Sequence, residues 1–271
     1  MFIGSEGTLG IVTEAILKVT ILPANQSVAV ATFPSIQNAA TCVAKVVESG
    51  IQVNGMEILD DVQMRCINDS GTTGRKWKEA ATLFFKFAGT KNGVKDQIDT
   101  VRKLAKQSGN LEFEFAKNDE EAQELWSARK EALWSVMAKR RDGNDHVWTT
   151  DVAVPISQLP QIIQETKDDL IKSGLLGGIV GHVGDGNFHC ILLYNDSEKE
   201  TATRVVDKMI YRAIEMEGTI TGEHGVGLKK RDHLIDELGE ETVNAMRKIK
   251  QAYDPYCLLN CDKIVQMDIG K

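Results

Sequence analysis

Apolar and polar positions along the first half of the chain predict strands that alternate with helices. Ser35 is the expected N-cap of the first helix, and Asn118 is expected to open a long helix that reaches about residue 139. The alternation of side chains predicts strands at 28–33, 53–58, 82–87 and 111–116, with further helices at 36–47, 60–67 and 94–107. An apolar run at 16–22 also has the composition of a strand.

The second half predicts the order strand, helix, strand, strand, helix, strand. These elements are expected at 149–154, 157–172, 178–183, 188–194, 198–217 and 219–221, and a last helix at 236–252 leads to a C-terminal tail. That order is the split βαβ arrangement of a ferredoxin-like unit, and the first half predicts a looser version of it. We therefore expect an α+β fold with one broad, largely antiparallel sheet, ferredoxin-like β-α-β-β-α-β halves and flanking helices.

The densest chemical pattern is a predicted hairpin with two histidines. Gly184-Asp185-Gly186-Asn187 is turn chemistry, so we expect Val183 to pair with Phe188 and His182 with His189. Paired residues share a face of the sheet with their Cβ atoms about 4.5–5.5 Å apart, a spacing that suits two imidazoles on one metal ion. Taken alone, the hairpin is equally well explained as a turn with two half-buried histidines.

A second segment changes that balance. Glu223 and His224 stand between glycines just after the strand expected at 219–221, where an exposed polar turn is the simpler explanation. Together the two segments supply His182, His189 and Glu223 as three ligands, an incomplete set of the kind that catalytic metal sites use. Zn²⁺ is the expected ion, with Mn²⁺ and Fe²⁺ as alternatives, and His224 is the candidate general base.

Composition excludes several classes of function. Hydrophobic residues make up 42% and charged residues 26% of the 271 residues, as in soluble globular proteins. The net charge is −7 and the 32 Lys and Arg are scattered, which argues against nucleic acid as a partner. No apolar run reaches the roughly 18 residues of a membrane span. The first eight residues lack the character of a targeting peptide, and the five scattered cysteines predict reduced thiols.

The two motifs together resemble a known family. The sequence at 182–189, followed by Gly-Glu-His-Gly-Val-Gly at 222–227, resembles the C-terminal domain of FAD-linked oxidases, a family that includes flavin-dependent D-2-hydroxyacid dehydrogenases. The glycine-rich start at 2–14 resembles the end of that family's flavin-binding domain. Segments 126–130 and 148–155 are most similar to the fungal mitochondrial branch that oxidises D-lactate and reduces cytochrome c.

This resemblance implies FAD-dependent oxidation of a small D-2-hydroxyacid in the mitochondrion, with D-lactate favoured and cytochrome c as electron acceptor. Arg129 occupies the position that binds the substrate carboxylate, although by itself it is explained as a solvated helix arginine. Ile191 and Thr149 stand where the 2-hydroxyglutarate branch uses polar residues, so a substrate without a second carboxylate is expected. D-2-hydroxyglutarate and glycolate remain alternatives within the family.

The resemblance also implies three parts. Residues 1–25 correspond to the end of a PCMH-type FAD-binding domain, 26–235 to the substrate- and metal-binding domain, and 236–271 to a helix and tail that return to the flavin. FAD contacts are expected from Gly4, Ser5, Gly7, Thr8, Gly10, Ile11, Asn260 and Lys263. Because most of the flavin domain is not in this sequence, we expect the chain alone to bind FAD poorly and to be nearly inactive.

Two other functions fit the same residues. A metal-binding remnant or interaction module would keep the hairpin for stability alone. A zinc hydrolase would use the ion with Glu223 and His224 and would need no flavin.

Overall fold

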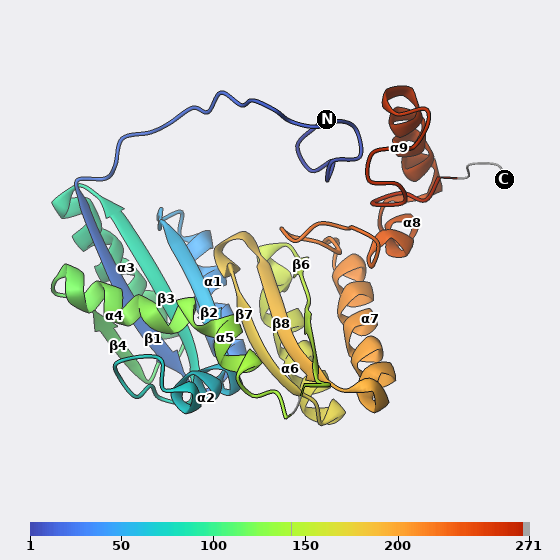
Figure 1. Cartoon of the computed structure of the whole chain (residues 1–271). Helices are drawn as coiled ribbons and strands as arrows, with labels where there is room; N and C mark the ends of the chain where they lie inside the picture. Colours follow the sequence, from blue (N-terminus) through green and yellow to red (C-terminus); the bar gives the residue numbers. More distant parts are fainter. Residues whose placement is uncertain (142, 268–271) are drawn as a thin grey trace.

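The fold is built on one broad antiparallel sheet with helices on both faces (Figure 1). The computed structural model describes residues 1–141 and 143–267, and in this part of the chain the strand order is β4-β1-β3-β2-β7-β8-β5, with β6 paired to β8. The strands are β1 (Asn25–Phe33), β2 (Gly55–Leu59), β3 (Ala81–Gly89), β4 (Glu112–Phe115), β5 (His146–Thr149), β6 (Val152–Ala153), β7 (Leu176–Gly181) and β8 (Asn187–Tyr194). The α+β class and the antiparallel sheet are confirmed.

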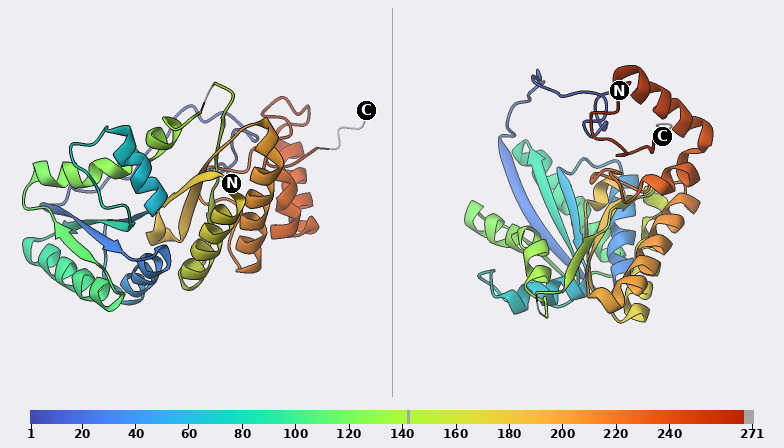
Figure 2. Two further views of the ribbon diagram at one scale, coloured as in Figure 1. Left: turned by 90° about the horizontal axis from the view of Figure 1, so that it is seen from below. Right: turned by 45° about the vertical axis from the view of Figure 1, so that its right-hand side comes forward.

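Helices divide between the two faces of the sheet according to the alternation of apolar residues in the strands. On β1, Ala29 and Ala31 join the core under α1 (Ile36–Glu48), α3 (Lys91–Gln107), α6 (Leu159–Ser173) and α7 (Lys199–Glu215). Val28 and Val30 point to the other face and pack with α2 (Asp61–Ser70), α4 (Asp119–Lys130) and α5 (Ala132–Met137). The left panel of Figure 2 shows the helix layers on the two faces of the sheet from below.

The sequence predicts a complete ferredoxin-like unit in the second half and a looser one in the first half, but the structure shows the opposite. The first half has the strand order β4-β1-β3-β2 of a complete unit, with α2 added between β2 and β3. In the second half the strand expected at 219–221 is reduced to a single bridge between Ala153 and Thr219. The strand expected at 149–154 is also interrupted, because Thr150 and Asp151 leave the ladder between β5 and β6.

Local signals place three helix starts correctly. Ser35, Asp60 and Asn118 each accept a hydrogen bond from a backbone N–H of the helix that follows. Two long helices predicted as continuous are divided. The helix from 118 ends at Lys130 and resumes as α5, and the last helix is α8 (Leu234–Leu238) followed by α9 (Glu240–Tyr253). Gly239, with φ +80° and ψ 153°, separates the latter pair.

The strand expected at 16–22 does not form. Ile16, Leu17 and Val19 are 97%, 79% and 86% exposed, and the segment crosses over the strand ends toward α9 (Figure 1). Within the described residues no strand pairs with it, so its backbone has no ladder to join. Among the described helices, none is both long and apolar enough to cross a membrane.

Candidate metal and active site

The two hairpin histidines lie side by side, although their predicted pairing is wrong. His189 is opposite Val180, so the register differs by two residues from the expected pairing with His182. The loop is longer than expected because 183–185 forms a turn of 3₁₀ helix after the end of β7. A shift of two preserves the face on which a side chain lies, and the ring centroids of His182 and His189 are 5.8 Å apart.

Glu223 completes a cluster of three converging ligand atoms. Its Oε1 lies 3.2 Å from Nε2 of His182 and 3.1 Å from Nε2 of His189. Four bonds of about 2.05 Å around a tetrahedral Zn²⁺ place neighbouring ligand atoms about 3.3 Å apart. The three side chains therefore already have the spacing of a metal-binding set, and a fourth position is left for another ligand.

Hydrogen bonds fix both histidines in the form that binds a metal. Nδ1 of His182 contacts the Glu57 carboxylate at 2.6 Å, and Nδ1 of His189 contacts the Thr150 carbonyl at 3.1 Å. Carboxylate and carbonyl oxygens only accept, so Nδ1 carries a hydrogen in both rings, and in a neutral ring Nε2 then keeps the lone pair. Nε2 of His189 is buried and makes no hydrogen bond within the described residues, although Oε1 of Glu223 lies 3.1 Å away. A metal ion would satisfy this atom.

Electrostatics favour the same form of His189. Burial, together with the neighbouring His224, lowers the pKa of His189 to about 4. The ring is therefore neutral at physiological pH, the state in which imidazole binds a metal.

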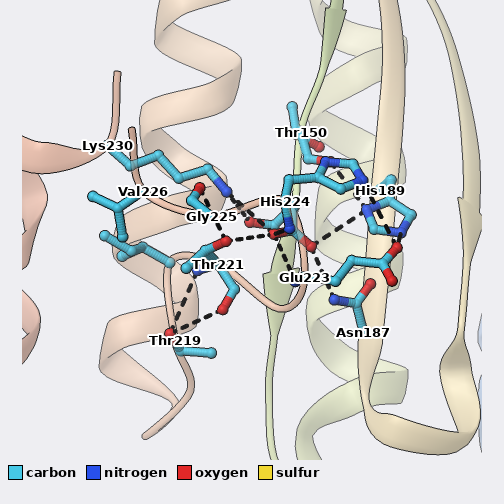
Figure 3. Close-up of polar contacts among 12 residues, drawn as sticks. Thr150, Asn187, His189, Thr219, Thr221, Glu223, His224, Gly225, Val226 and Lys230 are labelled. Atoms are coloured by element: carbon cyan, nitrogen blue, oxygen red, sulfur yellow. Dashed lines mark hydrogen bonds and ion pairs between the residues drawn. The ribbon is translucent and has the colours of Figure 1, made fainter. Parts of the chain in front are cut away.

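Asp151 holds the loop that carries Glu223 and His224. One of its carboxylate oxygens accepts hydrogen bonds from the backbone N–H groups of both residues, at 3.0 and 2.9 Å, and from the Thr221 hydroxyl at 2.7 Å. Figure 3 shows the loop lying against His189 and Asn187. Burial by itself raises the pKa of Asp151, but these hydrogen bonds and the charge of Lys230 hold it well below its ordinary value. Asp151 is thus a fixed negative charge.

Gly222 permits the close approach of this loop to the hairpin. A Cβ atom at this position would lie 1.5 Å from Nδ2 of Asn187 and 3.1 Å from Oδ1 of Asp151. Asn187 itself donates a hydrogen bond of 2.9 Å to Asp151, so loop, hairpin and carboxylate are packed without room for a side chain.

His224 lies beside the three ligand atoms without belonging to their set. Its ring stacks on His189 with centroids 4.5 Å apart and an interplanar angle of 8°. Its Nε2 is 3.7 Å from Oε1 of Glu223. The His224 side chain is 40% exposed and lies beside the cluster, a position that is compatible with proton transfer.

Arg129 reaches the site through Glu57. Its Nε donates a hydrogen bond of 2.7 Å to Oε2 of Glu57, whose other oxygen faces His182. Within the described residues its Nη atoms make no hydrogen bond. The predicted contact with a substrate carboxylate therefore stays a prediction, and the guanidinium already has a structural partner.

The residues expected to contact FAD divide between two neighbouring cavities. Ser5, Gly7, Gly10, Ile11 and Asn260 line an open groove of about 540 Å³, and the Asn260 amide donates to the Glu6 carbonyl. Gly4, Ser5 and Thr8 line a second cavity, of about 420 Å³, against α8 and α9. Lys263 lines neither of these two cavities. The structure thus brings the N-terminal segment and residues 258–260 to one groove, and their contacts with FAD stay a prediction.

The sequence did not single out three carboxylates that organise the site. Glu57 lies in the otherwise apolar strand β2, Asp151 lies between β5 and β6, and Glu6 binds the loop of His224. The Glu6 carboxylate accepts from the N–H groups of Val226 and Gly227 at 2.6 and 2.9 Å. A charged residue inside a strand was the available signal for Glu57, since buried acids are rare without a partner.

Comparison with known proteins gives matches over most of the chain. Residues 22–264 match the family described as FAD linked oxidases, C-terminal domain. The D-lactate dehydrogenase [cytochrome], mitochondrial, of Kluyveromyces lactis is 49% identical over 99% of this chain and 47% of its own length. D-lactate dehydrogenase [cytochrome] 1, mitochondrial, of Saccharomyces cerevisiae is 50% identical over 99% of this chain and 46% of its own length.

A solved structure shows the same fold at low identity. The 4-ethylphenol oxidase of Gulosibacter chungangensis is 14% identical, has a TM-score of 0.64, and is matched over 90% of this chain and 54% of its own. The family match and the two relatives are sufficient to classify the sequence: the chain belongs to the C-terminal domain family of FAD-linked oxidases. It spans about half the length of the curated relatives that it matches.

Proposed function

We propose that this chain provides the substrate- and metal-binding half of a mitochondrial, FAD-dependent D-2-hydroxyacid dehydrogenase. The convergence of Nε2 of His182, Nε2 of His189 and Oε1 of Glu223, with His224 stacked beside them, is the observation that carries the proposal. The names of the two fungal relatives support D-lactate as substrate, a cytochrome as electron acceptor and the mitochondrion as location, and we propose cytochrome c as that acceptor.

In this mechanism the chain's residues bind, orient and deprotonate the substrate. Bound FAD supplies the electron acceptor, and a bound divalent ion, Zn²⁺ by preference, supplies a Lewis acid that lowers the pKa of a hydroxyl group. His182, His189 and Glu223 would hold the ion. His224 accepts the hydroxyl proton on a ring nitrogen, and Arg129 pairs with the substrate carboxylate through its Nη atoms.

A pair of neighbouring residues supports a small substrate. Thr149 on β5 and Ile191 on β8 are register partners, and Ile191 is 3% exposed in an apolar cluster. Ile191 offers no hydrogen-bond donor to a second carboxylate, and a carboxylate next to an apolar surface loses its hydration without compensation. D-Lactate is therefore proposed over D-2-hydroxyglutarate.

Calorimetric titration of D-lactate into the chain tests the binding part of the proposal. We expect heat of binding with the Zn²⁺-loaded chain, no binding after chelation, and weaker binding of D-2-hydroxyglutarate. Equal binding with and without the ion, or none in either case, would contradict the proposal.

The redox part is tested by supplying a flavin-binding half in trans. This chain is mixed with the remaining half of the Kluyveromyces lactis relative, and the reduction of cytochrome c is followed by its visible absorbance. We expect cytochrome c reduction only when both halves and D-lactate are present. We expect His224→Ala to abolish this reduction and to leave the Zn²⁺ content unchanged. A hydrolase or a metal-binding remnant would give no reduction.

A further inference from the structure

Glu57 connects Arg129 to the candidate metal site. Arg129 on α4, Glu57 on β2 and His182 after β7 come from three separate elements, and each carboxylate oxygen of Glu57 has one of the other two as its partner. The distances are 2.7 Å on the arginine side and 2.6 Å on the histidine side. The Glu57 side chain is 11% exposed, so water competes little for these contacts.

The sheet register explains why Glu57 meets His182. Ile58 on β2 is opposite Gly181 on β7, so one step further along the antiparallel pair Glu57 faces His182. Gly181 allows the neighbouring hairpin strand to approach closely, because a Cβ atom there would lie 2.5 Å from Cα of Phe188. The juxtaposition is therefore fixed by backbone pairing and not by a flexible surface contact.

We infer that Glu57 and Arg129 are positioning residues for His182. Glu57 holds the hydrogen on Nδ1 and aims Nε2 at Glu223, and Arg129 fixes the carboxylate of Glu57 in that role. This inference rests on the proposed metal site and adds two residues to it. Carboxylates hydrogen-bonded to a metal-binding histidine typically change metal affinity by about 10- to 100-fold when they are removed.

This arrangement gives Arg129 a function that does not require substrate. A guanidinium forms five N–H donors in a rigid fork, so Nε can hold Glu57 while the Nη atoms remain available for another anion. Loss of Arg129 should then weaken the binding of the ion by itself, in the absence of any hydroxyacid. A residue that only binds substrate would leave the affinity for the ion unchanged.

The test measures Zn²⁺ affinity of the whole chain by competition with a chromophoric chelator, without substrate or flavin. Glu57→Gln and Glu57→Ala are expected to bind Zn²⁺ about 10- to 100-fold more weakly than wild type. Glu114→Gln is the matched control, since Glu114 also lies in the sheet and also pairs with an arginine, Arg75, but contacts no histidine. The control should bind like wild type.

A double-mutant cycle separates the role of Arg129. If Arg129 acts through Glu57, Arg129→Met lowers Zn²⁺ affinity in the wild-type background and has no further effect in Glu57→Ala. Additive losses of affinity in the double variant would overturn this relay, in which Arg129 acts on His182 through Glu57. ¹⁵N spectra of the metal-free chain give a second readout. The neutral His182 ring should carry its hydrogen on Nδ1 in wild type and shift toward the other nitrogen in Glu57→Ala.

The outcomes distinguish this inference from the proposed function. If wild type binds Zn²⁺ and both Glu57 variants bind it equally well, the relay is wrong and the metal site stands. If wild type binds no ion, the metal site and the relay both fail. A variant that unfolds is recognised by its circular dichroism, and Glu57→Gln then decides, because it keeps the shape of the side chain.

Discussion

The backbone N–H of His224 donates a hydrogen bond of 2.9 Å to the carboxylate of Asp151, 73 residues earlier in the chain. The same oxygen also receives the N–H of Glu223, so one buried charge sets the course of both residues of the Glu-His pair. Asp151 is 1% exposed, and Lys230 donates to its backbone carbonyl at 2.8 Å. The positions of a proposed metal ligand and of the candidate base thus depend on an acid outside the proposed ligand set.

Asp151→Asn should destabilise the fold and weaken metal binding together. The variant removes a charge that accepts from several donors and leaves Lys230 beside a neutral amide, so we expect a loss of about 2–4 kcal/mol in the free energy of unfolding. Urea denaturation measures it. Thr221→Val removes one hydrogen bond to the same oxygen and should cost only about 1 kcal/mol. Equal effects of the two variants would show that Asp151 has no organising role.

Gly222→Ala should disturb the site through sterics. The new Cβ atom would overlap the Asn187 amide, and overpacking of this kind costs about 1–3 kcal/mol. Gly74→Ala is the control, because a Cβ atom there meets nothing within 4 Å. We expect a lower melting temperature and weaker Zn²⁺ binding for the first variant and neither effect for the second. Wild-type behaviour of Gly222→Ala would contradict the close packing of the loop.

Acid should release the N-terminal segment from the C-terminal loop. Lys250 is buried and donates to the Thr8 carbonyl and to Asp254, and this contact together with the Leu259 N–H lowers the pKa of Asp254 from 3.8 to about 2. Since the pKa of Asp254 is depressed in the folded state, its stabilising effect is complete above pH 3.8 and is lost as the pH falls through about 2.

Hydrogen exchange of the amides of Ser5 and Thr8 measures this release. The protection of both amides, measured relative to their intrinsic exchange rates, should fall between pH 4 and 2, and in Lys250→Met it should already be lost at neutral pH. Protection that is independent of pH in wild type would show that the Lys250–Asp254 pair does not hold the segment.

Glu6→Ala should loosen the loop of His224 from the side of the N-terminal segment. Without the carboxylate, the N–H groups of Val226 and Gly227 lose their acceptor, and their amide exchange should accelerate about 5- to 10-fold, as expected for a net loss of about 1 kcal/mol. Glu14→Ala, a change of the same type in an exposed part of that segment, should leave both amides protected. Unchanged exchange in Glu6→Ala would contradict the anchor.

Local chemistry allowed much of the fold to be predicted. Ser35, Asp60 and Asn118 begin helices because a side-chain oxygen caps the N–H groups three residues on, which needs no tertiary information. The face shared by His182 and His189 was also predicted correctly, since a register error of two residues does not change the face.

What escaped prediction depends on partners distant in the sequence. Glu57 is 125 residues from His182, and Glu6 is 220 residues from Val226, so no spacing pattern could connect them. The register itself was missed because 183–185 turns as a 3₁₀ helix, which lengthens the loop. The apolar segment at 16–22 shows the converse case, because strand composition does not make a strand where residues 1–141 and 143–267 offer it no partner strand.

The metal content of the purified chain tests the central claim most directly. After incubation with Zn²⁺ and dialysis, we expect one ion per wild-type chain by plasma mass spectrometry, and no retained ion in His182→Ala, His189→Ala or Glu223→Gln. His146→Ala serves as the control, because this exposed histidine pairs with Asp196 away from the cluster, and it should retain the ion. A wild-type chain without the ion, or cluster variants that still hold it, would contradict the account.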